Sequence, residues 1–136
     1  MFSVLRVLPF VLILLAGLSQ PLAAQNLEDE IDGILIDRTV TLVGFRFVSE
    51  LGAYRRANEI KTSENLTVFE RPSARWGSLI WVKAGNDELY RRFVGPRLGE
   101  IPVLAQQASD QIEANFVQLK LRRLLSDRFD LDAEEF

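Results

Sequence analysis

The chain contains no cysteine and no histidine, and only one methionine among its 136 residues. Without histidine and cysteine the protein lacks the commonest general base, the thiol nucleophile and the usual ligands of tetrahedral zinc sites. Without cysteine no disulfide can stabilise the fold, even in an oxidising compartment. Stability must therefore come from packing, and a zinc or thiol enzyme is excluded.

Other catalytic signals are missing too. The eight glycines do not fall at the spacing of a dinucleotide or nucleotide phosphate loop. The carboxylates cluster in the two terminal segments, with nine of the 19, and we predict these segments to be mobile and unable to hold a catalytic geometry. Glu70 and Arg71 are neighbours in a predicted strand, so they point to opposite faces and form no dyad. We predict no enzymatic activity, no catalytic residues, no cofactor and no metal.

The chain also lacks an excess of positive charge. It has 16 Lys and Arg against 19 Asp and Glu, a formal net charge of −3. Leaving out the first 24 residues, which contain Arg6, gives 15 against 19 and a net charge of −4. Nucleic-acid-binding proteins usually carry a basic surface, so nucleic acid is not an expected partner.

One apolar run, Val7–Leu18, follows Arg6 near the amino terminus. It is shorter than the roughly 20 residues that a membrane-spanning helix needs, and Pro21–Ala24 offers small residues for cleavage. We interpret residues 1–24 as a signal peptide cleaved after Ala24, with a membrane anchor as the alternative. No cysteine follows, so a lipoprotein anchor is not expected. The mature chain of about 112 residues should be an exported, soluble single domain.

Residues 25–32 are predicted to be a flexible acidic lead-in. Gly33–Ile36 is a short apolar run that suits an edge strand or a docking segment. A helix is predicted next, capped by Asp37 or Thr39, in which Gly44 would permit the close approach of a strand. Its apolar positions follow the helical period: Val40, Val43, Gly44, Phe47, Leu51 and Tyr54.

Three strands are predicted after this helix, at Asn65–Arg71, Gly77–Lys83 and Glu88–Val94, with short connectors that favour an antiparallel meander. The middle strand is apolar on both faces, because Ile80 and Val82 alternate with Leu79 and Trp81. The second face therefore needs cover, either from the chain's own helix or tail or from a subunit or partner.

A second helix is predicted from Pro102 to about Leu125. Its main apolar stripe is Ile101, Leu104, Ala105, Ala108, Ile112, Phe116 and Leu119, and a wider set joins it later: Val117, Leu121, Leu124 and Leu125. Residues 126–136 form an acidic tail that is predicted to be flexible, although its apolar residues leave a docking peptide open. The fold class is α+β: residues 33–125 form a small single domain, with a three- to four-stranded antiparallel sheet and two helices packed mainly on one face.

The connector between the first two strands of the meander runs from Pro72 to Gly77, which suits a hairpin turn. It carries Arg75 and Trp76, with Arg71 beside it. Trp and Arg are enriched at binding hot spots, so contact with a partner is one reading. In the other, Trp76 folds back on the hairpin with Arg75 stacked on it. The candidate protein-interaction residues are Arg71, Pro72, Arg75, Trp76, Gly77, Leu79, Trp81 and Phe136.

The nine residues Glu70–Ser78, read ERPSARWGS, together with Asn65–Thr67, resemble the signature of the CsgE family, a curli production assembly/transport component. Further agreement lies at Gly33–Leu35 with Asp37, Thr39 and Val40, at Phe93 with Pro96, and at Asp130–Phe136. The chain departs from the family pattern at Phe45–Phe47, outside the hairpin.

The resemblance implies a periplasmic accessory factor that binds the mouth of the outer-membrane curli secretion channel, associated with a ring-shaped homo-oligomer. It would direct unfolded curli amyloid subunits into that channel. Two alternatives stay open: a periplasmic holdase that prevents premature aggregation without engaging the channel, and a small secreted structural or inhibitory domain.

Overall fold

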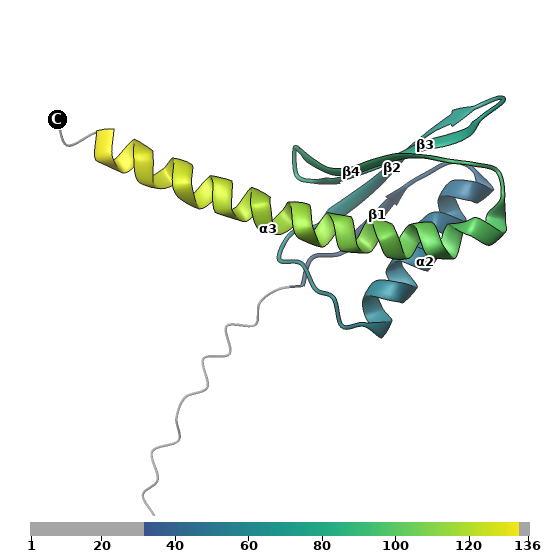
Figure 1. Cartoon of the computed structure of the whole chain (residues 1–136), viewed down its shortest axis with the longest axis horizontal. Coiled ribbons are helices and arrows are strands. Elements are labelled where there is room, and N and C mark those ends of the chain that lie inside the picture. Colours follow the sequence, from purple (N-terminus) through teal and green to yellow (C-terminus); the bar gives the residue numbers. More distant parts are fainter. Residues whose placement is uncertain (1–31, 134–136) are drawn as a thin grey trace, which may run out of the picture. The chain divides into compact units, whose positions relative to one another are not determined.

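The computed structural model describes residues 32–133. In order these form β1 (Leu35–Arg38), α2 (Leu42–Ala57), β2 (Leu66–Ser73), β3 (Gly77–Ala84), β4 (Asp87–Val94), the short 3-10 helix η1 (Leu98–Glu100) and α3 (Ile101–Ala133) (Figure 1). The predicted signal peptide, nearly all of the lead-in and Phe136 lie outside the described residues. Within residues 32–133, no helix is long and apolar enough to cross a membrane.

The sheet has four strands in the order β1-β2-β3-β4. The predicted meander is confirmed, because β2, β3 and β4 pair antiparallel. The expectation of a purely antiparallel sheet is wrong at β1, which pairs parallel to β2 with Leu35 opposite Leu66. The reason is α2, which carries the chain back along the sheet and so lets two consecutive strands run in the same direction. Gly33–Ile36 thus contributes to an edge strand.

Both helices cover the same face of the sheet, as predicted. Ile80 and Val82 of β3 are fully buried there, together with Phe47 and Leu51 of α2. The α3 stripe completes the core with residues that are buried: Ile101, Ala105, Ala108, Ile112, Phe116 and Leu119. One core therefore lies between a sheet layer and a helix layer, and within residues 32–133 no helix lies on the other face of the sheet.

The start of α2 depends on a carboxylate from β2. Thr41 is the N-cap, rather than Asp37 or Thr39, and its hydroxyl accepts a hydrogen bond from the Gly44 amide at 3.3 Å. Glu70 accepts hydrogen bonds from the amides of Val40 and Thr41, both at 2.8 Å. A Cβ at Gly44 would lie 2.4 Å from a Glu70 carboxylate oxygen. Gly44 therefore permits the close strand approach that the sequence predicts.

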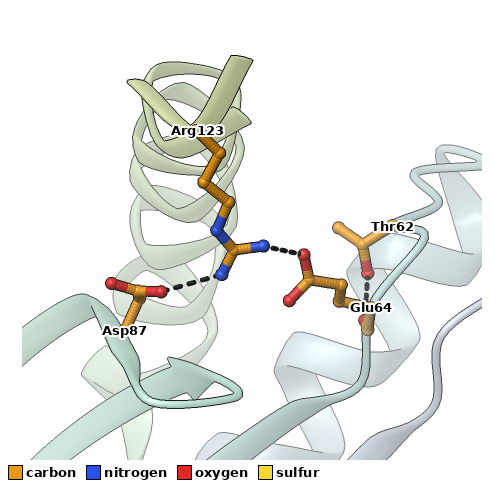
Figure 2. A network of polar contacts seen from close by, with 4 residues as sticks. All are labelled: Thr62, Glu64, Asp87 and Arg123. Atoms are coloured by element: carbon orange, nitrogen blue, oxygen red, sulfur yellow. Dashed lines mark hydrogen bonds and ion pairs between the residues drawn. The ribbon is translucent and has the colours of Figure 1, made fainter. Parts of the chain in front are cut away.

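The second helix is longer than predicted. It continues to Ala133, so residues 126–133 of the acidic tail are helical. Arg123 fastens the helix to the end of the sheet, because its guanidinium pairs with Asp87 at 2.8 Å and with Glu64 (Figure 2). From residue 121 to residue 129 every position is exposed. The C-terminal part of α3 projects past the sheet (Figure 1).

Candidate functional site

The tip of the β2–β3 hairpin is built by a proline and a glycine at defined places. β2 runs through Pro72 to Ser73, one residue beyond the predicted start of the connector, and the turn is residues 74–76. Because β1 ends opposite Phe69, β2 is an edge strand at Pro72, where a missing N–H is tolerated. Gly77 has φ of 90°, and a Cβ there would lie 2.1 Å from the Val94 carbonyl oxygen. Only glycine fits this turn without strain.

Trp76 stands at the tip with 73% of its surface exposed. Arg71 and Arg75 are also exposed, and neither makes an ion pair within the described part of the chain. In residues 32–133 the cation–π contacts involve other residues, so Arg75 is not stacked on Trp76. The stacked pair that the folded-back alternative predicts is therefore absent from the described residues.

A shallow cavity of about 530 Å³ lies beside Trp76 on the sheet face that the helices leave open. Three neighbouring strands contribute to its lining, since Arg71 of β2 lies opposite Leu79 of β3, which lies opposite Phe93 of β4. The full lining is Arg71, Pro72, Ser73, Trp76, Leu79 and Phe93. The cavity thus combines an apolar floor with one cationic side chain at its margin.

The same open face continues along the sheet. Phe69 and Trp81 stack with ring centroids 5.5 Å apart and an interplanar angle of 12°. The Arg91 guanidinium lies 5.5 Å from the Trp81 centroid and donates two hydrogen bonds to Glu88. Hydrogen bonds from Arg91 hold the pKa of Glu88 below its usual value. We call Phe69, Leu79, Trp81 and Phe93 the outer sheet face.

The structure brings most of the predicted interaction residues to one end of this face. Arg71, Pro72, Trp76 and Leu79 line the cavity, while Gly77 shapes the turn. The others lie elsewhere: Arg75 is on the turn outside the lining, Trp81 is farther along the sheet, and Phe136 is outside the described residues.

Sequence reasoning missed Phe93, which is 59% exposed and forms part of the cavity floor, and it missed Phe69 and Arg91. The alternation of β4 could have placed Phe93 and Arg91 on one face. Their position opposite Leu79 and Trp81 depends on the strand register, which includes a bulge between Val82 and Lys83 and cannot be read from the pattern alone.

A second apolar surface lies on α3. Val117, Leu121 and Leu124 recur at intervals of four and three residues, so they share one side of the helix. That side is not the one that buries Phe116 and Leu119 in the core. Together with Leu125 and Phe129 these side chains are between 54% and 73% exposed.

Exposed aromatic and guanidinium side chains over an apolar sheet face are typical of a protein-binding domain. Comparison with known proteins identifies the family. The family model for the curli assembly protein CsgE matches residues 31–135. The chain belongs to the CsgE family.

Two relatives are curli production assembly/transport components CsgE. The protein of Salmonella typhi is 32% identical over 115 residues, which cover 85% of this chain and 86% of the relative. The protein of Escherichia coli O6:H1 is 33% identical over 117 residues, which cover 84% of this chain and 88% of the relative. The resemblance noted in the sequence is confirmed.

Proposed function

We propose that the protein is an exported, non-enzymatic factor of curli assembly that works in the periplasm. It binds the periplasmic mouth of the outer-membrane curli secretion channel as a homo-oligomer and directs unfolded curli amyloid subunits into it. Membership of the CsgE family supports the role in curli assembly. Confinement of a client in a closed volume would make its escape into the channel entropically favourable.

One structural observation supports the binding role above all others. The outer sheet face is apolar and carries an exposed hairpin with Trp76 and two arginines, yet neither helix covers it. A soluble domain rarely leaves such a contiguous patch open unless the patch contacts another molecule. We therefore assign the hairpin to contact between subunits or with the channel.

Trp76→Ala tests this assignment. Because the indole is mostly exposed, its removal should leave the melting temperature unchanged, while assembly and curli export are lost. Phe45→Ala is the matched control, since Phe45 is 52% exposed on α2 and should retain both activities. Sedimentation, channel co-purification and export are measured for each variant. If Trp76→Ala melts markedly lower and export falls only in proportion to the protein lost, the residue is structural and the assignment fails.

A holdase that acts without the channel is the second candidate, because the same open face could pair with an aggregation-prone client strand. The two candidates differ in one measurement. A holdase would delay aggregation of the curli subunit in the absence of the channel, and it would show no affinity for the channel itself. Co-purification of the mature protein with the channel decides in favour of the first candidate.

A further inference from the structure

Two apolar surfaces of this chain have no cover within the described residues. One is the outer sheet face with its hairpin cavity. The other is the side of α3 that carries Val117, Leu121 and Leu124, which begins beside the core and continues into the part of the helix that leaves the sheet. We call residues 117–133 the α3 extension. The two surfaces are complementary in shape, since one is a shallow apolar face and the other is a projecting apolar ridge.

The two surfaces cannot meet within one chain, because they lie at opposite ends of the sheet. Arg123 marks one end, where it contacts Glu64 just before β2 and Asp87 at the β3–β4 turn. The hairpin tip lies at the far end of β2, about 26 Å away for eight strand residues. The α3 extension continues in the opposite direction, for about 15 Å beyond Arg123. Figure 1 shows the hairpin of β2 and β3 and the C-terminal part of α3 on opposite sides of the domain.

Their charges are complementary. The hairpin presents Arg71 and Arg75, which have no acidic partner in the described part of the chain. The last eleven residues of the sequence contain one basic residue, Arg128, and five acidic ones: Asp127, Asp130, Asp132, Glu134 and Glu135. Complementary charges of this kind select the partner and fix its orientation more than they add affinity.

We propose that the α3 extension of a second copy of this chain docks on the outer sheet face. Its apolar side would cover Leu79 and Phe93, and its acidic end would lie beside Arg71 and Arg75. This inference rests on the self-association proposed above and specifies which two surfaces meet. The contact is heterologous, since each copy offers a different surface to each neighbour. Heterologous contacts close into a ring or continue as a filament, according to the rotation between copies.

Two double variants of the full chain separate this arrangement from others. Arg71→Glu with Arg75→Glu inverts the charge of the hairpin, and Leu121→Ser with Leu124→Ser removes the apolar side of the extension. All four residues are exposed, so the fold should be retained. We expect each double variant alone to associate at least about tenfold more weakly than the wild type. Arg46→Glu with Arg56→Glu, two exposed arginines of α2 on the helix side of the sheet, is the charge-matched control and should assemble normally.

The decisive experiment mixes the two double variants. Each retains one intact surface, so a heterologous contact predicts a one-to-one heterodimer that grows no further, seen by analytical ultracentrifugation. If the wild type assembles while the mixture stays monomeric, the inference is overturned and self-association must use another contact, such as hairpin to hairpin. If the hairpin variant assembles like the wild type but no longer retains a curli subunit, the face binds the client and the inference is also overturned. A wild type that is monomeric at every concentration would remove the proposed self-association and this inference together.

Discussion

Glu70 should contribute measurably to stability through its charge, and Glu70→Gln tests this at almost constant volume. The carboxylate accepts hydrogen bonds from two backbone amides at the start of α2 and from the hydroxyl of Thr41, the N-cap. Burial alone would raise the pKa of Glu70, but hydrogen bonds from Ser78, Thr41 and the two amides outweigh it and hold the pKa below the usual 4.5. The negative charge also faces the positive end of the helix dipole.

The magnitude follows from this geometry. Hydrogen bonds to a charged acceptor contribute about 1.5–3 kcal/mol and those to a neutral acceptor about 0.5–1.5 kcal/mol. Glu70→Gln should therefore lower the free energy of unfolding by about 1–2 kcal/mol. For a domain of this size, that equals a decrease of very roughly 4–16 °C in melting temperature. Glu50→Gln is the control, because Glu50 makes only a surface pair with Arg46 on the same helix. We expect it to lower stability by at most about 0.5 kcal/mol.

Urea titrations of the wild type and Glu70→Gln at several pH values isolate the contribution of the Glu70 charge to the free energy of unfolding. Since the folded-state pKa lies below the unfolded value, the unfolded chain binds the extra proton, and stability rises with pH in this range. The contribution of Glu70 is therefore fully present above about pH 4.5 and is lost as the pH falls through its lowered folded-state pKa. The difference between wild type and variant should shrink toward zero on acidification. A difference that is equal at pH 7 and pH 3 would refute the reasoning.

Two further predictions concern the ends of the sheet. Gly77→Ala should lower the free energy of unfolding, measured by urea titration, by more than about 1 kcal/mol. The reason is that φ is positive at Gly77 and an added Cβ would meet a carbonyl oxygen of β4. Gly99→Ala is the control and should be neutral, because the space around Gly99 is open. Arg123→Gln should speed amide hydrogen exchange in α3 beyond the sheet without changing the melting temperature, because it removes the contacts with Glu64 and Asp87; unchanged exchange would show that these pairs do not hold the helix.

Local patterns in the sequence predicted most of the fold. The helical period placed Phe47 and Leu51 in the core, and strand alternation placed Ile80 and Val82 there. The parallel pairing of β1 was not predictable in the same way, because four residues carry no signal for the direction of their partner. The cap of α2 was missed for a related reason. Glu70 reaches Thr41 across 29 positions of sequence, and such a contact exists only after the sheet and helix have packed.

The candidate site shows the same division between local and long-range information. Pro72, Trp76 and Gly77 are close in sequence, so turn chemistry was enough to place them together. Phe93 entered the site only through the register of β4 against β3. The extent of α3 was underestimated because the acidic residues after Leu125 favour a solvated coil by composition, although the helix continues through them.

Packing in the core of its own domain does not explain why α3 continues beyond the sheet. The residues of α3 that the core requires end at Leu119, yet the helix extends fourteen positions farther and carries leucines on a side that the core does not use. Isolated helical segments of this length are marginal in water, so a partner surface would stabilise the extension. The hairpin at the opposite end of the sheet is also uncovered, because no part of residues 32–133 packs over its rigid turn and exposed indole. Contact between the two in successive copies would cover both surfaces at once.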